Sequence, residues 1–214
     1  MDAEFVTVKP QIGAFRRMVR ELEFDVCEIA PTTYIIARAY GKKFKALPIF
    51  VVRRFHHSGL LVRPDAGIVS PKDLEGKPCG VRAYSVTTGV WTRQVLIDEF
   101  GVDNNKIIWW VDDEEHVQEL QLPANVRHVA ASDSLADMMA RGDIIAGFDA
   151  AAGIGAPARR PAAGRRSRPI IPTSSPMRRN WRRTIMPAPK SIRCTAPSSS
   201  RMRYWSSIPG SPAR

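Results

Sequence analysis

Hydrophobic and polar residues alternate along this chain with two different periods, and each change of period marks a new element within the first 149 residues. A period of two predicts a strand, whereas apolar residues that recur every three to four positions predict a helix. Strands are predicted at 4–9, 24–30, within 46–62, and at 79–83, 106–111, 126–131 and 144–148. Helices are predicted at 12–22, 31–41, 70–77, 87–101, 112–120 and 134–142.

Strands and helices alternate throughout this part of the chain, which predicts an α/β domain with a largely parallel sheet. Capping residues support some of the boundaries. Ser70 precedes a proline and stands three residues before Asp73, a variant of the capping box, and Ser132 or Asp133 is the expected cap of helix 134–142. In such a sheet, ligands bind at the carboxyl ends of the strands.

One strand-to-helix turn is rich in hydroxyl groups. Strand 79–83 is followed by Tyr84 and Ser85 in the turn, and by Thr87 and Thr88 at the start of the next helix. Free backbone N–H groups and the positive end of the helix dipole favour an anion at such a turn, and a carboxylate fits. The alternative is that Ser85 or Thr87 only caps its own helix.

A second turn of this kind precedes helix 31–41, where Thr32, Thr33 and Tyr34 follow Pro31. Pro31 is well suited to a first helical turn. Because both turns follow predicted strands, we expect them to face one cleft. Tyr34 is either a ligand contact at this helix start or a packing residue of the helix.

The charge of the chain is uneven, and this changes what its composition suggests. The chain has 32 Lys+Arg and 21 Asp+Glu, and a net charge of +11 alone favours a nucleic-acid partner. However, residues 1–149 contain all 21 acidic residues and only 18 basic ones. The residues after them carry 14 basic side chains and 10 of the 17 prolines, without hydrophobic periodicity. We therefore expect the tail 153–214 to be disordered.

Cysteine usage and the first residues suggest a location. Cys27, Cys79 and Cys194 are an odd, widely spaced set without a CxxC pair, so we expect reduced structural thiols. The chain begins MDAEF, where a secretory leader would be basic and then apolar, and it has no apolar run of about 18 residues. We expect a cytoplasmic protein without membrane insertion, or a periplasmic one if a signal peptide precedes this sequence.

The run from Arg53 to Asp103 resembles the 4,5-dihydroxyphthalate decarboxylase family, relatives of the solute-binding proteins of ABC transporters. The matching features are RRFHHS, DAGI, SPKDLEGK, the hydroxyl turn and DEFGVD, joined upstream by VKP, MVRE, FDVCE and AYGK. The resemblance covers residues 4 to about 152. It implies a type II periplasmic-binding-protein fold, in which two α/β lobes with mixed or parallel sheets close on a small ligand.

The resemblance also implies a division of the chain. Residues 1–62 would form a partial first lobe, residues 63–152 a second lobe, and residues 153–214 the basic tail. The family has a first strand and helix ahead of Glu4, and its return crossing to the first lobe would fall within the tail. We therefore expect a truncated, poorly stable and inactive fold.

The activity that the resemblance implies is the decarboxylation of a dihydroxylated aromatic dicarboxylate without a cofactor. This reaction requires a bound dianion and a proton delivered to the ring carbon. By analogy, the two hydroxyl turns bind the carboxylates and Arg82 is a charge partner. The expected substrate-binding residues are Thr32, Thr33, Tyr34, Arg82, Tyr84, Ser85, Thr87 and Thr88.

His57, within RRFHHS, matches the family's histidine and is the candidate general acid, because imidazole titrates near neutral pH. The alternative is a partly exposed histidine on a strand between the lobes. A metal site is disfavoured, since the four histidines of the chain lack metal-binding spacing. These are His56, His57, His116 and His128.

Other conspicuous side chains have simpler interpretations. Trp91, Trp109 and Trp110 stand at helix and strand positions, which favours a core role over stacking on an aromatic ligand. The acidic run 112–115 is typical of a solvated helix start rather than of paired catalytic carboxylates. Neither GxGxxG nor a P-loop is present, so a nucleotide cofactor has no support.

The sequence suggests three classes of function. The leading hypothesis is a decarboxylase whose partner is a small carboxylated aromatic molecule, and a homo-oligomer stays open. The alternative is an ABC-transporter-type solute-binding protein for a small anionic or aromatic ligand. Nucleic-acid binding through the arginine-rich tail is disfavoured, because the tail contains no nucleic-acid-binding motif.

A shift of reading frame near Gly155 accounts for the composition of the tail. In the shifted frame, each new codon consists of the last base of one codon of residues 169–214 and the first two bases of the next. With suitable synonymous codons, this frame encodes a different peptide. That peptide has aliphatic segments typical of strands, acidic segments typical of helices, and the family's IYPMH segment. We predict that the gene encodes this peptide in its alternate frame. Resequencing the DNA around the codon of Gly155 tests this, and an alternate frame without a family-like peptide removes the hypothesis.

Overall fold

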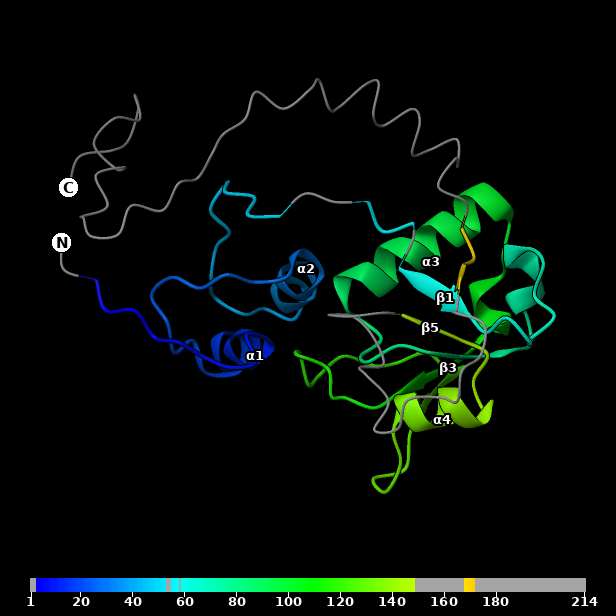
Figure 1. Cartoon of the computed structure of the whole chain (residues 1–214). Coiled ribbons are helices and arrows are strands. Elements are labelled where there is room, and N and C mark those ends of the chain that lie inside the picture. The colour runs from blue at the N-terminus through cyan, green and yellow to red at the C-terminus, as the bar shows by residue number, and fades with distance from the viewer. Residues whose placement is uncertain (1–2, 53–54, 58, 149–167, 172–214) are drawn as a thin grey trace, which may run out of the picture.

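A computed structural model of the chain describes residues 3–52, 55–57, 59–148 and 168–171 (Figure 1). The α-helices are α1 (Ile12–Glu21), α2 (Pro31–Ala39), α3 (Thr87–Phe100) and α4 (Leu135–Arg141), and the short 3-10 helices are η1 (Pro71–Leu74) and η2 (Asn104–Lys106). The strands are β1 (Leu60–Val62), β2 (Pro78–Gly80), β3 (Ile108–Val111), β4 (Val126–His128), β5 (Ala146–Phe148) and β6 (Arg168–Pro169).

Within the described part of the chain, six strands form one sheet in the order β4-β3-β2-β5-β1-β6. Strands β4, β3, β2 and β5 are parallel, whereas β1 runs antiparallel to both of its neighbours. The carboxyl ends of β2 and β3 therefore lie side by side at one edge of the sheet. The predicted α/β class with a mixed, largely parallel sheet is confirmed.

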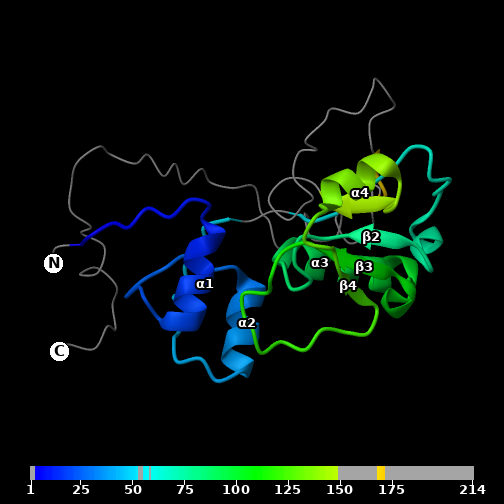
Figure 2. The same ribbon diagram turned by 90° about the horizontal axis from the view of Figure 1, so that it is seen from below.

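Helices α3 and α4 cover opposite faces of this sheet (Figures 1 and 2). On β3, Trp109 belongs to the cluster that includes Leu96 of α3, whereas the next residue, Trp110, packs against the cluster that includes Met138 of α4. Successive side chains of a strand point to opposite faces, so a strand between two helical layers is apolar on both sides. This explains the run KIIWWV.

Trp109 lies at the centre of the core. Its side chain is fully buried and stacks on Phe148 of β5 with ring centroids 6.3 Å apart. Its Nε1 donates a hydrogen bond to Asn104 Oδ1 at 3.0 Å, so the polar end of the indole is satisfied. The expected core role is confirmed for Trp109, whereas Trp91 is 50% exposed on α3.

The N-terminal quarter of the chain differs most from the prediction. Helices α1 and α2 form as expected, but the segments 4–9 and 24–30 are not strands, and among the described residues of 46–62 only β1 is one. A strand requires a neighbouring strand for its backbone hydrogen bonds, and periodicity alone does not supply one. The apolar residues of the unformed third strand are exposed; they are Leu47, Ile49, Phe50, Val51 and Val52.

Several predicted helix ends are confirmed, and one cap is corrected. The capping box of Ser70 and Asp73 forms on the short η1, and Gly101 ends α3 with a φ of 62°, in the region that favours glycine. Helix α4 is capped by Ser134, whose hydroxyl accepts from the N–H of Asp137. Ser132 was therefore the wrong cap, and Asp133 pairs instead with the guanidinium of Arg141.

One further expectation was wrong. The acidic segment 112–120 forms no helix, because its side chains and backbone bind neighbouring elements, as described below. In the tail, residues 168–171 are ordered: β6 pairs with β1, and Ile170 and Ile171 are buried in the main core. The rest of the predicted tail lies outside the described residues.

Two features of the described residues concern hydropathy and the cysteines. In these residues, no helix has the length and apolar character needed to cross a membrane. Cys27 and Cys79 are free thiols, and burial raises the pKa of each. Cys194 lies outside the described residues.

We predict that Trp109→Ala lowers the free energy of unfolding by about 3–5 kcal/mol, because it removes a fully buried aromatic side chain and leaves a cavity. Urea denaturation followed by circular dichroism measures the change. The matched control is Trp91→Ala on the half-exposed face of α3, for which we expect a loss below about 1 kcal/mol. Equal losses in the two variants would contradict the assignment of the core.

Candidate functional site

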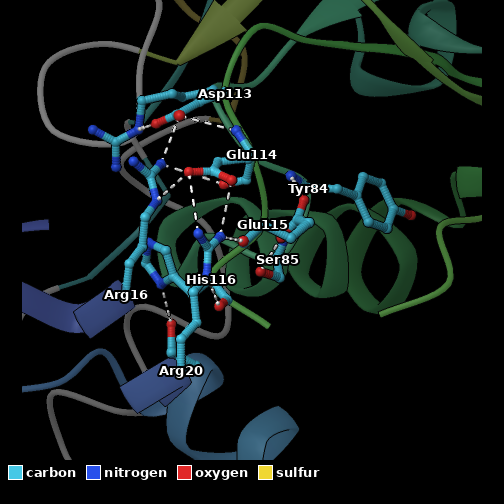
Figure 3. Close-up of polar contacts among 10 residues, drawn as sticks. Arg16, Arg20, Tyr84, Ser85, Asp113, Glu114, Glu115 and His116 are labelled. Atoms are coloured by element: carbon cyan, nitrogen blue, oxygen red, sulfur yellow. Dashed lines mark hydrogen bonds and ion pairs between the residues drawn. The ribbon is translucent and has the colours of Figure 1, made fainter. Parts of the chain in front are cut away.

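The hydroxyl turn lies where the sequence placed it, at the carboxyl end of a parallel strand. Strand β2 ends at Gly80, residues 81–86 form the turn, and α3 begins at Thr87. Ser85 and Thr88 are both buried. The neighbouring strand β3 leads into the segment 112–117, so this acidic segment and the turn face each other at the same edge of the sheet (Figure 3).

A carboxylate of the chain itself occupies the donors of this turn. Glu115 Oε1 accepts a hydrogen bond from the N–H of Tyr84 at 2.6 Å, and Glu115 Oε2 accepts one from the N–H of Ser85 at 3.2 Å. The Ser85 hydroxyl also donates to Oε2. Glu115 is only 9% exposed. The turn therefore has the geometry of a carboxylate site, and in this structure Glu115 is the carboxylate.

The second hydroxyl turn, at the start of α2, touches the first. Thr32 Oγ1 donates to the carbonyl oxygen of Ser85 at 2.8 Å and lies 2.8 Å from Thr87 Oγ1. Thr32 and Thr33 are both buried. The first turns of α2 and α3 are therefore in direct contact.

His116 joins this arrangement from the segment after β3. Its Nδ1 lies 2.7 Å from Thr33 Oγ1, and its ring packs edge-on against Phe15. The side chain is buried, and its Nε2 has no hydrogen-bond partner among the described residues. Burial and the nearby guanidinium groups of Arg16, Arg82 and Arg20 lower the pKa of His116 to about 4, so the imidazole is neutral at pH 7.

Arginines from α1 hold the acidic segment in place (Figure 3). Arg16 pairs with Asp113 at 2.6 Å, and Arg20 pairs with Glu114 at 3.0 Å. Arg20 also donates to the carbonyl oxygen of Glu115 at 2.9 Å. These bonds engage both side chains and backbone, which explains why the segment is irregular rather than a solvated helix.

The side chains of Arg82 and Tyr34 have partners other than the carboxylate of Glu115. Arg82 Nε lies 3.7 Å from a carboxylate oxygen of Asp113, and burial lowers its pKa. Tyr34 packs edge-on against Phe44, with ring centroids 5.8 Å apart, which is the packing alternative considered for this residue.

A buried arginine that the sequence analysis did not select lies beneath the turn. Arg93 donates from Nη2 to the carbonyl oxygen of Tyr84 at 2.7 Å, and its guanidinium lies 3.8 Å from the centroid of the Tyr84 ring. The Tyr84 hydroxyl accepts from Asn104 Nδ2 at 3.0 Å, so it is directed away from Glu115. Burial lowers the pKa of Arg93 to about 10, and the guanidinium keeps its charge at pH 7.

The polar contact that the structure gives His57 is with Glu99, near the end of α3. His57 Nε2 lies 3.3 Å from Glu99 Oε1, and both side chains are buried. A helical rise of 1.5 Å per residue places Glu99 about 18 Å along α3 from Thr87. Thr92 holds this segment against α3 through a 3.0 Å bond to the carbonyl oxygen of His56. His57 is thus buried rather than partly exposed, and Gly59, two residues further along, lies close enough to the turn that a Cβ there would be 3.0 Å from Thr88 Cγ2.

A metal centre finds no support in the described residues, which contain no group of three or more His, Cys, Asp or Glu side chains arranged to hold an ion. Of the four consecutive carboxylates, Asp112 to Glu115, Asp113 and Glu114 share Arg16, whereas Asp112 and Glu115 accept hydrogen bonds from other residues. Asp112 accepts from the N–H of Leu135 at 3.3 Å, and its pKa is raised by burial. The site therefore consists of hydrogen-bond donors, hydroxyl groups and a histidine.

Sequence reasoning missed Glu115, His116 and Arg93. The signal for the first two was present, since they follow β3, whose carboxyl end is adjacent to that of β2 in a parallel sheet. The run DDEEH was instead interpreted from its charge. Arg93 carried no signal, because one arginine within a helix is normally exposed.

Comparison with known proteins shows a family match and two similar curated proteins. The chain matches the family described as ABC transporter, phosphonate, periplasmic substrate-binding protein over residues 1–178. It is 35% identical over 152 residues to a 4,5-dihydroxyphthalate decarboxylase of Comamonas testosteroni. This alignment covers 67% of this chain and 46% of that protein. It is 32% identical over 152 residues to the protein of the same name from Pseudomonas putida. That alignment covers 67% of this chain and 58% of the Pseudomonas protein. The chain spans about half the length of these curated relatives, and the resemblance found in the sequence is confirmed.

We predict that His116 makes the fold sensitive to acid. Because its folded-state pKa of about 4 lies below the usual value near 6.5, the unfolded chain binds the proton more readily. The contribution of the neutral imidazole is complete above about pH 6.5 and is lost as the pH falls towards 4. Urea denaturation at pH 7 and pH 4.5 should show that the unfolding free energy falls by about 2 kcal/mol more in the unchanged chain than in His116→Gln.

The matched control for this prediction is His128→Gln. His128 is exposed at the end of β4, so its replacement should leave the pH dependence of the unchanged chain intact. A pH dependence that is the same in all three proteins would show that His116 titrates normally.

Proposed function

We propose that this chain, which belongs to the family of ABC transporter phosphonate periplasmic substrate-binding proteins, binds a small aromatic dicarboxylate at the turn between β2 and α3, as part of a decarboxylase of the 4,5-dihydroxyphthalate type. One observation carries the proposal. The backbone N–H groups of Tyr84 and Ser85, together with the Ser85 hydroxyl, hold a carboxylate in this structure. A ligand carboxylate in the position of Glu115 would meet the same donors.

Charge around the turn supports an anionic ligand. Arg93 lies directly beneath it, and Arg82 is one of the residues of the turn itself. The positive end of α3 adds a partial charge of the same sign. The hydroxyl groups of Thr32 and Thr87 lie 2.8 Å apart beside the turn and add polar groups to its surroundings. A dianion therefore suits this environment better than a neutral or cationic molecule does.

The decarboxylase part of the proposal rests on the names of both curated relatives and on a histidine beside the turn. Decarboxylation of an aromatic acid requires a proton at the ring carbon that loses carbon dioxide. We assign the proton delivery to His116 in place of His57, because His116 is adjacent to Glu115 in the chain and bonded to Thr33. A bound dianion would oppose the effect of the neighbouring arginines and raise the pKa of His116 towards neutrality.

A second candidate function is capture of a small anion for import, which the match to a substrate-binding family favours. In that case the same turn holds the ligand and no chemistry follows. Both candidates require the carboxylate site, and only the decarboxylase releases carbon dioxide.

We predict that the chain binds 4,5-dihydroxyphthalate and that Ser85→Ala weakens the binding by roughly 10-fold or more, the usual effect of losing a hydrogen bond to a charged group. The 214-residue chain should release no carbon dioxide, whereas the protein restored to the alternate reading frame should release it. Isothermal titration measures the binding, and headspace carbon dioxide measures the reaction.

The matched control is Ser132→Ala in the exposed loop before α4, which should bind as the unchanged chain does. Binding without carbon dioxide from the restored protein would favour the solute-binding function. Failure of both proteins to bind the dicarboxylate, or an unchanged affinity in Ser85→Ala, would reject the carboxylate site itself.

A further inference from the structure

The residue that fills the carboxylate site belongs to the chain, and it is almost completely buried there. Glu115 makes four bonds to the turn through two carboxylate oxygens, whereas its neighbour Glu114 makes exposed ion pairs with arginines of α1. Glu115 therefore differs from the rest of the acidic run: its partners are the donors of the turn between β2 and α3.

We propose that Glu115 is an internal competitor for the ligand, which occupies the carboxylate site until an aromatic dicarboxylate displaces it. This inference rests on the proposed function, because it assigns the same donors to the ligand. A carboxylate oxygen of the ligand and one of Glu115 cannot accept the same N–H bonds of Tyr84 and Ser85 at once. Binding then requires the side chain of Glu115 to rotate out of the turn.

A second observation indicates that the site has capacity for another anionic group. Arg93 is 7% exposed, and its Nη1 is buried without a hydrogen-bond partner among the described residues. This nitrogen lies beside the first turn of α3, only 3.2 Å from the position that a Cβ on Gly89 would take. A buried cationic donor without an acceptor is costly, and a bound anionic oxygen would satisfy it.

The neighbours of Glu115 allow its side chain to move while its backbone stays in place. Arg20 holds the carbonyl oxygens of Glu115 and His116, and Arg16 holds the carboxylate of Asp113. None of these bonds involves the Glu115 carboxylate. Displacement would therefore break only the bonds to the turn, and the segment would remain attached to α1.

The competing explanation is that Glu115 simply joins two loops. Under that explanation, removing its charge weakens the fold and does nothing for the ligand. Under the proposal, removing its charge strengthens ligand binding even though the fold loses some stability. The sign of the change in affinity separates the two.

The experiment is isothermal titration of 4,5-dihydroxyphthalate into the unchanged chain, Glu115→Gln and Glu119→Gln. Glu119 is exposed and pairs with Lys42, so its variant is a matched control in the same segment. We expect Glu115→Gln to bind roughly 10- to 100-fold more tightly, the effect of removing a competing set of charge-assisted hydrogen bonds. Glu119→Gln should bind as the unchanged chain does.

An affinity in Glu115→Gln that is equal to or weaker than that of the unchanged chain would overturn the competitor role and leave the proposed function standing. Absence of binding in both proteins would reject the proposed function as well. If Glu115→Gln does not fold, carbon-13 NMR of the glutamate carboxylates in the unchanged chain decides the matter. Saturating ligand should shift the Glu115 resonance, and an unmoved resonance in the bound state would overturn the proposal.

Discussion

The carboxylate of Glu115, bound by the backbone N–H groups of Tyr84 and Ser85, is the interaction on which the arrangement of the site depends. It joins the loops that follow two adjacent parallel strands, and it satisfies donors that would otherwise be buried without partners. A charged acceptor is the strongest partner such donors can have. The same chemistry makes the turn suitable for a ligand carboxylate, so structure and proposed function rest on one set of donors.

Charge pairing also explains how the N-terminal helices are attached to the sheet. The apolar contact between them is small, with Val19, Ala37 and Val117 as its buried members. Most of the remaining contact is polar, through the arginines of α1 and the segment after β3, and through the threonines of α2 and the turn before α3. Each polar contact of this kind stabilises the fold less than the burial of an apolar side chain does. A ligand carboxylate can therefore replace one side-chain carboxylate at a modest cost in stability.

The sequence predicted the elements from β1 to β5 more accurately than the elements that precede β1. The strand-to-helix turn at Tyr84 and Ser85 was predicted because local hydrophobic periodicity and turn chemistry agree there. Strands at 4–9 and 24–30 were not formed, because a strand also requires a neighbour, which local pattern does not reveal. Part of the site was predicted. Both hydroxyl turns were identified, whereas Glu115 and His116 belong to an acidic segment that was interpreted as a solvated helix. Their roles depend on the parallel pairing of β2 and β3, a long-range feature.

The central claim is that the turn between β2 and α3 is a carboxylate site that Glu115 and a ligand occupy in alternation. A crystal structure of the chain with 4,5-dihydroxyphthalate tests it most directly. The account predicts a ligand carboxylate within hydrogen-bond distance of the N–H groups of Tyr84 and Ser85, with the Glu115 side chain rotated away. A ligand bound elsewhere, with the Glu115 carboxylate still on these two N–H groups, would contradict it.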